Sequence, residues 1–316
     1  MMATKSVLVM MSTYNGALYL KEQLDSIFCQ IGVDVFLLVR DDGSNDATCS
    51  ILEEYSDKHN NLIWNKGINL GFVNSFSALI RKAIELNHHF DFYAFADQDD
   101  IWDPEKLRVA CNCLSLKNDK LPNLFTCNSI MIDSNGDRIG LFHEQEPYYS
   151  RGNVLVFSTE QGCSMVFNSK ALELYNGNPP KVTFHDRWMN LICFYLGETY
   201  YSHTPLFFYR LHGGNALGQV HMASDKRGLL YKVSRLLSHY TDGKPLTKHV
   251  EMSKEFLKCF GNMISEKDKK LFLIYISYRY KVSSKLYMLF SNNYKCPYSS
   301  LKQRVRFFLY LLFSKI

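Results

Sequence analysis

The sequence predicts an α/β protein: a wound, mostly parallel sheet with helices on both faces, followed by a C-terminal helical region. Apolar runs of strand length alternate with stretches whose apolar residues have helical spacing. Residues 220–316 contain 19 Lys and Arg against 6 Asp and Glu, whereas residues 1–219 contain 17 against 25. This change of charge predicts two parts, a domain over residues 1–219 and a basic, aromatic-rich helical region over residues 220–316.

The first hundred residues repeat a strand followed by a helix. We expect strands at 6–11, 33–39, 61–65 and 90–96, and helices at 18–28, 46–55 and 72–86. This alternation is typical of a parallel sheet that is covered on both faces. Asp103 and Pro104 predict the start of another helix, because aspartate caps helices and proline suits their first turn. Further on, we expect a helix at 184–196 and extended chain at 199–210.

The composition, with 47% apolar and 21% charged residues, is that of an ordinary globular protein. The nine cysteines are scattered without the paired spacing of a zinc site, which favours reduced thiols in the cytosol. We see no signal peptide and no apolar run long enough to span a bilayer. Neither a dinucleotide-binding glycine motif nor a P-loop motif is present.

Polar residues follow each of the four predicted strands, at 12–15, 40–44, 69–71 and 97–100. Because the carboxyl ends of parallel strands share one edge of a sheet, we expect these loops to line one crevice. The last loop places Asp97, Asp99 and Asp100 within four positions, where like charges repel. A hard divalent cation such as Mg²⁺ would offset that repulsion, since it prefers carboxylate oxygens. The alternative is an acidic loop that only caps the next helix and solvates the turn.

The series STYNG, RDDGSND, NLGF, FADQDDIWDPEKL, QGCSMVFN, FHDRW and YRLHGGN resembles, in this order, the family 2 glycosyltransferases with the GT-A fold. Among these it is most similar to bacterial rhamnosyltransferases, over residues 6–216. The resemblance implies a catalytic domain over residues 1–219 whose crevice binds a nucleotide diphosphate sugar, with Mg²⁺ or Mn²⁺ on the diphosphate. It implies inverting, metal-dependent transfer of a sugar, in the first place L-rhamnose from dTDP-rhamnose, to a surface polysaccharide or its lipid-linked precursor.

The resemblance also assigns roles on the donor side of the site. Thr13 and Tyr14 are expected against the base and ribose, and Asp41, or less favourably Asp42, accepts the base imide N–H. The full set expected to bind the nucleotide sugar is Thr13, Tyr14, Asn15, Asp41, Asp42, Asn69, Asp97 and Gln98. Asp99 is expected to be the direct metal ligand, with His212 completing the metal shell or contacting the diphosphate. The alternative for His212 is a satisfied surface or core histidine.

The chemistry is expected at FHDRWMN, where Asp186 matches the base that takes a proton from the acceptor hydroxyl. The alternative is a capping box with Thr183, in which Asp186 only caps its own helix. The resemblance places Gly162, Cys163, His185 and Trp188 on the acceptor side. The arginine that the family often has after the NxG element is absent, since Phe72, Val73 and Asn74 stand there.

Aromatic and aliphatic residues alternate with Lys and Arg in the tail, which favours contact with an anionic membrane surface. The alternative is a helical subdomain packed on the catalytic domain. We therefore expect a cytoplasmic enzyme, peripheral at the inner face of the cell membrane, with no nucleic-acid partner. Rival functions are transfer from UDP-hexose or UDP-N-acetylhexosamine, and a non-catalytic module that binds a sugar nucleotide or glycan.

Overall fold

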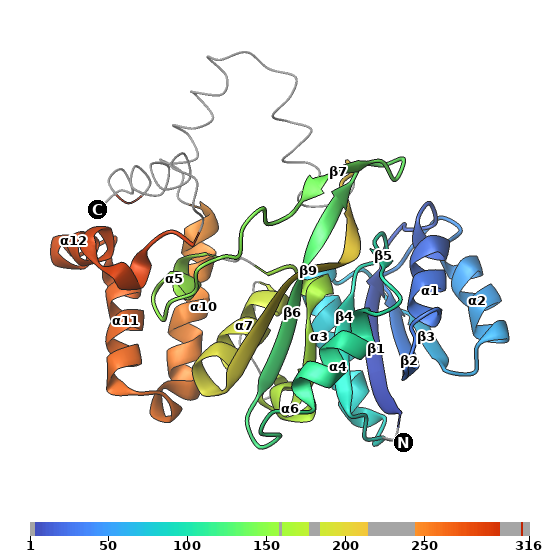
Figure 1. Cartoon of the computed structure of the whole chain (residues 1–316), viewed down its shortest axis with the longest axis horizontal. Helices are drawn as coiled ribbons and strands as arrows, with labels where there is room; N and C mark the ends of the chain where they lie inside the picture. The colour runs from blue at the N-terminus through green and yellow to red at the C-terminus, as the bar shows by residue number, and fades with distance from the viewer. Residues whose placement is uncertain (1–3, 158–159, 177–183, 214–243, 298–310, 312–316) are drawn as a thin grey trace, which may run out of the picture. The chain divides into compact units, whose positions relative to one another are not determined.

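The computed structural model describes residues 4–157, 160–176, 184–213, 244–297 and 311 (Figure 1). The chain divides into two compact units. The first comprises Met1–Phe142, Glu160–Asn178 and Phe184–Arg210, and the second comprises His143–Thr159, Pro179–Thr183 and Leu211–Ile316. Residues 143–159 thus group with the C-terminal helices. The boundary predicted between residues 219 and 220 lies outside the described part of the chain.

The first unit contains one mixed sheet with helices packed against it. Its strands are β1 (Lys5–Thr13), β2 (Val33–Asp41), β3 (Leu62–Lys66), β4 (Phe92–Ala96), β5 (Ile101–Trp102), β6 (Asn123–Ile132), β7 (Arg138–Leu141), β8 (Val166–Asn168) and β9 (Glu198–Arg210). Its helices are α1 (Leu20–Phe28), α2 (Thr48–Lys58), α3 (Phe72–Glu85), α4 (Lys106–Leu114), the 3₁₀ turn η1 (Gly162–Ser164), α6 (Ser169–Asn176) and α7 (His185–Leu196).

The strand order is β3-β2-β1-β4-β8-β6-β9-β5, with β7 beside β6. Strands β3, β2, β1 and β4 are parallel, β8 is antiparallel to β4 and β6, and β9 runs parallel to β6. This confirms the predicted wound α/β fold. The order reverses after β3, so a right-handed connection places α3 on the opposite face from α1 and α2. Accordingly α1 contacts α2, while α3 contacts α6 and α7 (Figure 1).

The predicted elements of the first hundred residues are all present, each within three residues of its expected bounds. Strand β1 forms because Val7 to Met11 are apolar without interruption, and all five are at most 2% exposed. Such a run suits a strand that is buried on both faces. Helix α3 begins after Gly71, whose φ of +77° favours glycine.

Helix α4 begins later than the sequence predicts. Asp103 accepts a hydrogen bond from the Glu105 N–H at 2.9 Å, as a cap does. However, the Lys106 N–H bonds the Asp103 carbonyl at 3.0 Å, an i to i+3 contact. The first turn is therefore tightened, and the regular helix starts at Lys106 rather than at Pro104.

The second unit is helical among its described residues: α5 (Asn153–Val156), α10 (Lys244–Phe260), η2 (Gly261–Met263), α11 (Glu266–Ser277), α12 (Val282–Phe290) and η3 (Asn292–Tyr294). Arg151 holds Asp268 through two hydrogen bonds, at 2.8 and 2.7 Å, which joins the segment before α5 to α11. Phe256 of α10 stacks on Phe272 of α11, with ring centroids 5.1 Å apart. Among the described helices, none has both the length and the apolar character that a bilayer span requires.

Candidate active site

The carboxyl ends of the four parallel strands are aligned at one edge of the sheet. Thr13 at the end of β1 pairs with Asp41 at the end of β2, and Asp41 pairs with Lys66 at the end of β3. Met11 of β1 pairs with Ala96, the last residue of β4. The four polar loops therefore leave the sheet side by side, as their positions after strands predict. The order of strands reverses at this edge, between β1 and β4, where wound sheets bind their ligands.

The loop after β1 is fixed by hydrogen bonds that its backbone N–H groups donate to side chains elsewhere in the first unit. The N–H groups of residues 14–17 all bond side chains of other segments, namely two loops and the start of α2. The acceptors are Gln98 for Tyr14 at 2.8 Å, Ser44 for Asn15 at 2.8 Å, Thr48 for Gly16 at 2.9 Å and Asp46 for Ala17 at 3.1 Å. Asn15 adopts a φ of +47°, and its own side chain accepts from the Asn45 N–H at 2.9 Å. The Tyr14 side chain stays partly open to solvent, since the residue is 46% exposed.

Asp41 is fully buried and hydrogen-bonded within its own loop. Its carboxylate accepts from the Thr13 hydroxyl at 3.0 Å and from the Ser44 N–H and hydroxyl at 2.8 and 2.5 Å. Burial alone would raise the pKa of Asp41, but these hydrogen bonds hold it below its usual value. Contact between this carboxylate and a nucleotide base remains a prediction from the resemblance.

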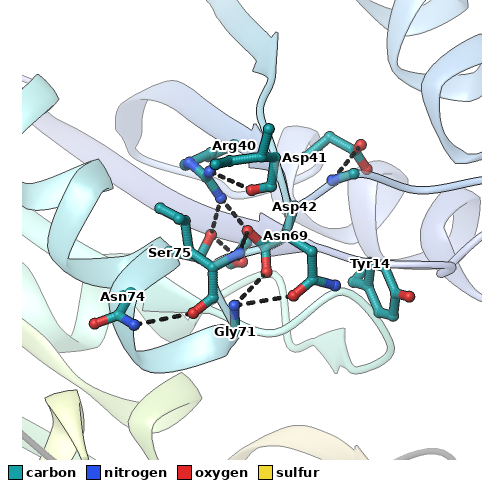
Figure 2. A network of polar contacts seen from close by, with 12 residues as sticks. Tyr14, Arg40, Asp41, Asp42, Asn69, Gly71, Asn74 and Ser75 are labelled. Carbon is teal, nitrogen blue, oxygen red and sulfur yellow. Dashed lines mark hydrogen bonds and ion pairs between the residues drawn. The ribbon is translucent and has the colours of Figure 1, made fainter.

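Asp42 organises the loop after β3. Its carboxylate accepts the N–H groups of Leu70 and Gly71, both at 2.8 Å, and pairs with the Arg40 guanidinium (Figure 2). Arg40 also donates to the Ser75 hydroxyl at 3.0 Å. The Asn69 side chain accepts from the Gly71 N–H at 3.1 Å. One buried ion pair thus fixes the loop that carries Asn69.

The acidic loop after β4 meets η1. One potential ligand atom each from Asp97, Asp100 and Cys163 lies within 4.8 Å of the others. Asp99, which the sequence nominates as the direct metal ligand, is not a member of this cluster. Burial, and then the charge of Asp99, raise the pKa of Asp97 to about 7, and burial with both neighbouring charges raises that of Asp100 well above its usual range.

These side chains fit a hard divalent cation. The Asp100 Oδ2 atom is buried and has no hydrogen-bond partner among the described residues. A cation would supply the missing partner and favour the charged carboxylates. Cys163 is a poorer ligand for such a cation, because its sulfur is soft and burial raises the pKa of its thiol. The carboxylates of the loop are therefore the oxygen donors that Mg²⁺ or Mn²⁺ requires.

Two buried cations beside this loop were not among the residues predicted from the sequence. Lys106 is 0% exposed, donates to the Cys163 carbonyl at 2.6 Å and lies 3.1 Å from the centre of the Trp102 ring. Burial lowers the pKa of Lys106 to about 8, against the opposing effect of the nearby acidic groups. Arg210, at the end of β9, donates to the Asp99 carbonyl at 3.0 Å. Lys106 and Arg210 lie in the motifs PEKL and YRLHGGN, which can be read from the sequence, but the sequence does not show that the two side chains are buried.

Asp186 lies in the first turn of α7, half-buried beside η1. A Cβ added to Gly162 would lie 3.1 Å from His185 Nε2 and 3.2 Å from Asp186 Cβ, so the absence of a side chain allows this close approach. His185 stacks on Phe76 with ring centroids 3.9 Å apart, and burial lowers its pKa to about 4. The charge of Asp186 contributes to the raised pKa of Asp97, which places the expected base within electrostatic range of the acidic loop.

Asp186 bonds the first turn of its own helix, as the capping alternative expects, but not from the position of a capping box. The N-cap position is occupied by Phe184, so Asp186 is the second helical residue and not the third that a capping box requires. Its Oδ1 atom nevertheless accepts the Arg187 N–H at 2.7 Å, which satisfies one free helix donor. Thr183, the expected partner, lies outside the described residues.

The other residues predicted for the site lie in three kinds of place: in the core, in a contact between loops and in the second unit. Cys163 and Trp188 are each 1% exposed, so they shape the first unit from inside. Gln98 is bound to the Tyr14 backbone, as its Nε2 also donates to the Tyr14 carbonyl at 3.1 Å. His212 follows β9 and belongs to the second unit. Its role at a metal remains a prediction.

Comparisons with known proteins agree with this architecture. Residues 8–163 match the family model described as Glycosyl transferase family 2. The chain is 29% identical over 222 residues to the dTDP-rhamnosyl transferase RfbG of Shigella flexneri, covering 66% of this chain and 73% of that protein. It is 24% identical over 215 residues to the uncharacterized glycosyltransferase RT0329 of Rickettsia typhi, covering 65% of this chain and 64% of that protein.

Two solved structures share the fold. The S. aureus TarS fragment 1-349 superposes with a TM-score of 0.56 at 17% identity, covering 96% of this chain and 77% of that chain. The mannosyltransferase PcManGT from Pyrobaculum calidifontis, solved with GDP-Man and Mn²⁺, has a TM-score of 0.51 at 14% identity, covering 99% of this chain and 86% of that chain. The wound sheet and the acidic loop at its edge, together with these comparisons, define a glycosyltransferase with the GT-A fold. Residues 8–163 carry a glycosyltransferase family 2 domain.

Proposed function

We propose that the protein is an inverting, metal-dependent glycosyltransferase that moves L-rhamnose from dTDP-rhamnose to a surface polysaccharide or its lipid-linked precursor. The identity of 29% to a dTDP-rhamnosyl transferase over 222 residues supports the donor. The position of Asp186 beside the acidic loop supports the reaction. In the main alternative, the donor at the same site is UDP-hexose or UDP-N-acetylhexosamine.

The reaction requires a proton acceptor and a means to stabilise the leaving diphosphate. Asp186 takes the proton of the acceptor hydroxyl as that oxygen attacks the anomeric carbon from the face opposite the diphosphate. Gly162 allows η1 to pack closely against Asp186, and the neutral imidazole of His185 adds no positive charge that would weaken this base. Tyr14, Asn15 and Asn69 line the donor side, with Asp41 and Asp42 as the framework of their loops.

Asp99 would hold Mg²⁺ or Mn²⁺ next to Asp97, on the loop that also carries Asp100. The bound cation supplies charge neutralisation at the leaving diphosphate. Within the chain, Arg210 positions the Asp99 backbone, and Lys106 provides a buried positive charge close to Asp97 and Asp100. The first loop has no free N–H among residues 14–17 for the diphosphate, because side chains bind all four.

The second unit supports attachment to an anionic membrane at the inner face of the cell membrane. Val282, Leu286 and Phe290 are spaced four residues apart on α12, and they are 56%, 49% and 79% exposed. Leu273 and Tyr280 are also exposed, at 58% and 75%. Exposed lysines are also found on this part of the chain, at Lys267, Lys270 and Lys281. Apolar side chains with surrounding lysines suit the boundary between lipid headgroups and acyl chains.

The test is thermal stabilisation of the protein by dTDP, UDP, GDP and ADP, each with and without Mn²⁺. A ligand at about 100 times its dissociation constant adds about 2.7 kcal/mol, which raises the melting temperature by several degrees. We expect the largest shift with dTDP, and only when Mn²⁺ is present, followed by release of dTDP from dTDP-rhamnose. If UDP gives the largest shift, the donor is a UDP-sugar and not dTDP-rhamnose. The absence of a shift with every nucleotide would refute a sugar-nucleotide site.

A further inference from the structure

Gln98 lies in the middle of the acidic loop, but its amide is bound to another loop. The Tyr14 N–H donates to Gln98 Oε1 at 2.8 Å, and Gln98 Nε2 donates to the Tyr14 carbonyl at 3.1 Å. We call this pair of hydrogen bonds the Gln98–Tyr14 bridge. It joins residues 84 positions apart and spans the point where the strand order reverses between β1 and β4. Both backbone groups of Tyr14 are therefore satisfied by one side chain.

Gly16 gives independent evidence that this place is reserved for the Gln98 amide. A Cβ added to Gly16 would lie 2.2 Å from Gln98 Oε1, 2.4 Å from Cδ and 2.9 Å from Nε2. Its φ is not positive, unlike those of Gly32, Gly43, Gly71 and Gly136, so the backbone itself would accept alanine. The missing side chain is thus explained by space for the Gln98 amide.

The bridge also decides what the first loop offers to a ligand. The N–H groups of residues 15–17 are bound by Ser44, Thr48 and Asp46, and the bridge binds that of Tyr14. What remains open is the Tyr14 side chain. Its placement relative to residues 97–100 depends on the bridge, because no other hydrogen bond to a side chain fixes the Tyr14 backbone among the described contacts.

We propose that Gln98 is a positioning residue: it does not contact the donor but sets the Tyr14 ring at a fixed place relative to the metal-binding loop. The proposal rests on the proposed function, since it assumes that Tyr14 contacts the nucleotide. Glutamate could accept from the Tyr14 N–H but could not donate to its carbonyl. Asparagine has the right groups on a side chain that is one methylene too short.

The first test is a double-mutant cycle on nucleotide binding. The probe is dTDP with Mn²⁺, or whichever nucleoside diphosphate gives the wild type its largest thermal shift. Gln98→Ala should weaken binding about tenfold, the equivalent of one or two lost hydrogen bonds. In the Tyr14→Ala background the same change should weaken binding by less than about twofold, since Gln98 acts through Tyr14. Equal losses in both backgrounds would mean that Gln98 contacts the donor directly, and the proposal would be wrong.

Kinetics provide a readout that a merely structural role would not give. Gln98→Ala should raise KM for the donor and leave kcat nearly unchanged, because neither Gln98 nor Tyr14 is at the reacting atoms. A fall in kcat with an unchanged KM would contradict the proposal. So would a Tyr14→Ala variant that binds the nucleotide as well as the wild type.

The second test uses stability and needs no ligand. Gly16→Ala should lower the melting temperature of the wild type, because its Cβ displaces the Gln98 amide. In the Gln98→Ala background it should be neutral or slightly stabilising, as alanine restricts the unfolded chain. Gly261→Ala, with no atom within 4 Å of the added Cβ, is the control. Equal destabilisation in both backgrounds would overturn the bridge. If the wild type binds no nucleotide, the proposed function fails, whereas this cycle still decides whether the bridge exists.

Discussion

The guanidinium of Arg40 is paired with the carboxylate of Asp42, and the two residues are only 7% and 2% exposed. Removing one partner of a buried pair leaves an uncompensated charge. Asp42→Ala also frees the Leu70 and Gly71 N–H groups, so we expect a loss of about 3–5 kcal/mol of unfolding free energy, measured by urea denaturation. Lys82→Ala, in an exposed pair with Glu85, is the control and should change little. A loss of less than about 1 kcal/mol for Asp42→Ala would mean that the pair does not fix this loop.

Asp186→Asn separates catalysis from binding. We expect kcat to fall by about 10²- to 10⁴-fold, because the amide cannot take the acceptor proton. Nucleotide affinity, measured by thermal shift, should stay the same. Glu198→Gln, at the exposed start of β9, is a matched removal of a carboxylate that should alter neither quantity. Full activity in Asp186→Asn would leave only the helix-capping role seen in its contact with the Arg187 N–H.

Asp99 and Asp100 should respond differently to replacement by asparagine. The pKa of buried Asp100 is raised by burial and by Asp99 and Asp97, so its proton is held to a higher pH in the folded chain than in the unfolded chain. The protonated Asp100 therefore stabilises the folded chain at low pH, and this contribution to the unfolding free energy is lost as the pH rises above about 4. Without metal, Asp100→Asn should melt above the wild type at pH 8 and match it near pH 4.

Asp99→Asn should instead abolish the part of the nucleotide-induced thermal shift that requires Mn²⁺. The comparison uses the same buffer and pH for both variants. If Asp100→Asn loses that shift and Asp99→Asn keeps it, the ligand would be the carboxylate in the cluster with Asp97 and Cys163.

His185 predicts an acid-sensitive fold. Burial lowers its pKa to about 4 from an ordinary value near 6.5, so the unfolded chain takes up the proton first as the pH falls. Stability is therefore lost between pH 6.5 and 4, with about 2 kcal/mol lost at pH 5. Because other groups titrate in this range, the measurement is the difference in unfolding free energy between wild type and His185→Leu from pH 8 to pH 5. A difference that does not change with pH would contradict the buried, neutral imidazole.

The exposed face of α12 predicts binding to anionic lipid. Leu286→Glu and Phe290→Glu together should reduce co-sedimentation with phosphatidylglycerol vesicles, because they remove apolar contacts and add negative charge. Neither protein should bind phosphatidylcholine vesicles strongly. Leu116→Glu, at a residue of the first unit that is 85% exposed, serves as the control. Unchanged binding by the double variant would exclude this helix face as the membrane contact.

Strands β1 and β4 were predictable because Val7–Met11 and Phe92–Ala96 are apolar without interruption. The edge on which the polar loops meet followed from strand direction alone. The start of α4 was not predictable, since the Lys106 N–H bonds the Asp103 carbonyl and tightens a turn that capping rules treat as helix.

The contacts within the site were less predictable, because they join distant segments. Cys163 reaches the acidic loop only through the antiparallel pairing of β8 with β4. Lys106 is fully buried, although a lysine at a helix start usually indicates an exposed position. Gln98 has an amide side chain of the kind that often binds ligands. Only the structure reveals that this amide is already bound to the Tyr14 backbone.

In the first unit, the donor side and the acceptor side of the site come from separate stretches of the sequence. The loops expected to contact the donor all lie before residue 101, whereas Gly162, His185 and Asp186 come after β6. A recombination event between α4 and β6 would therefore exchange the nucleotide requirement while it keeps the acceptor side intact. The hydrogen bond from buried Lys106 to the Cys163 carbonyl crosses that junction, so an exchanged segment would have to retain this lysine to keep the contact.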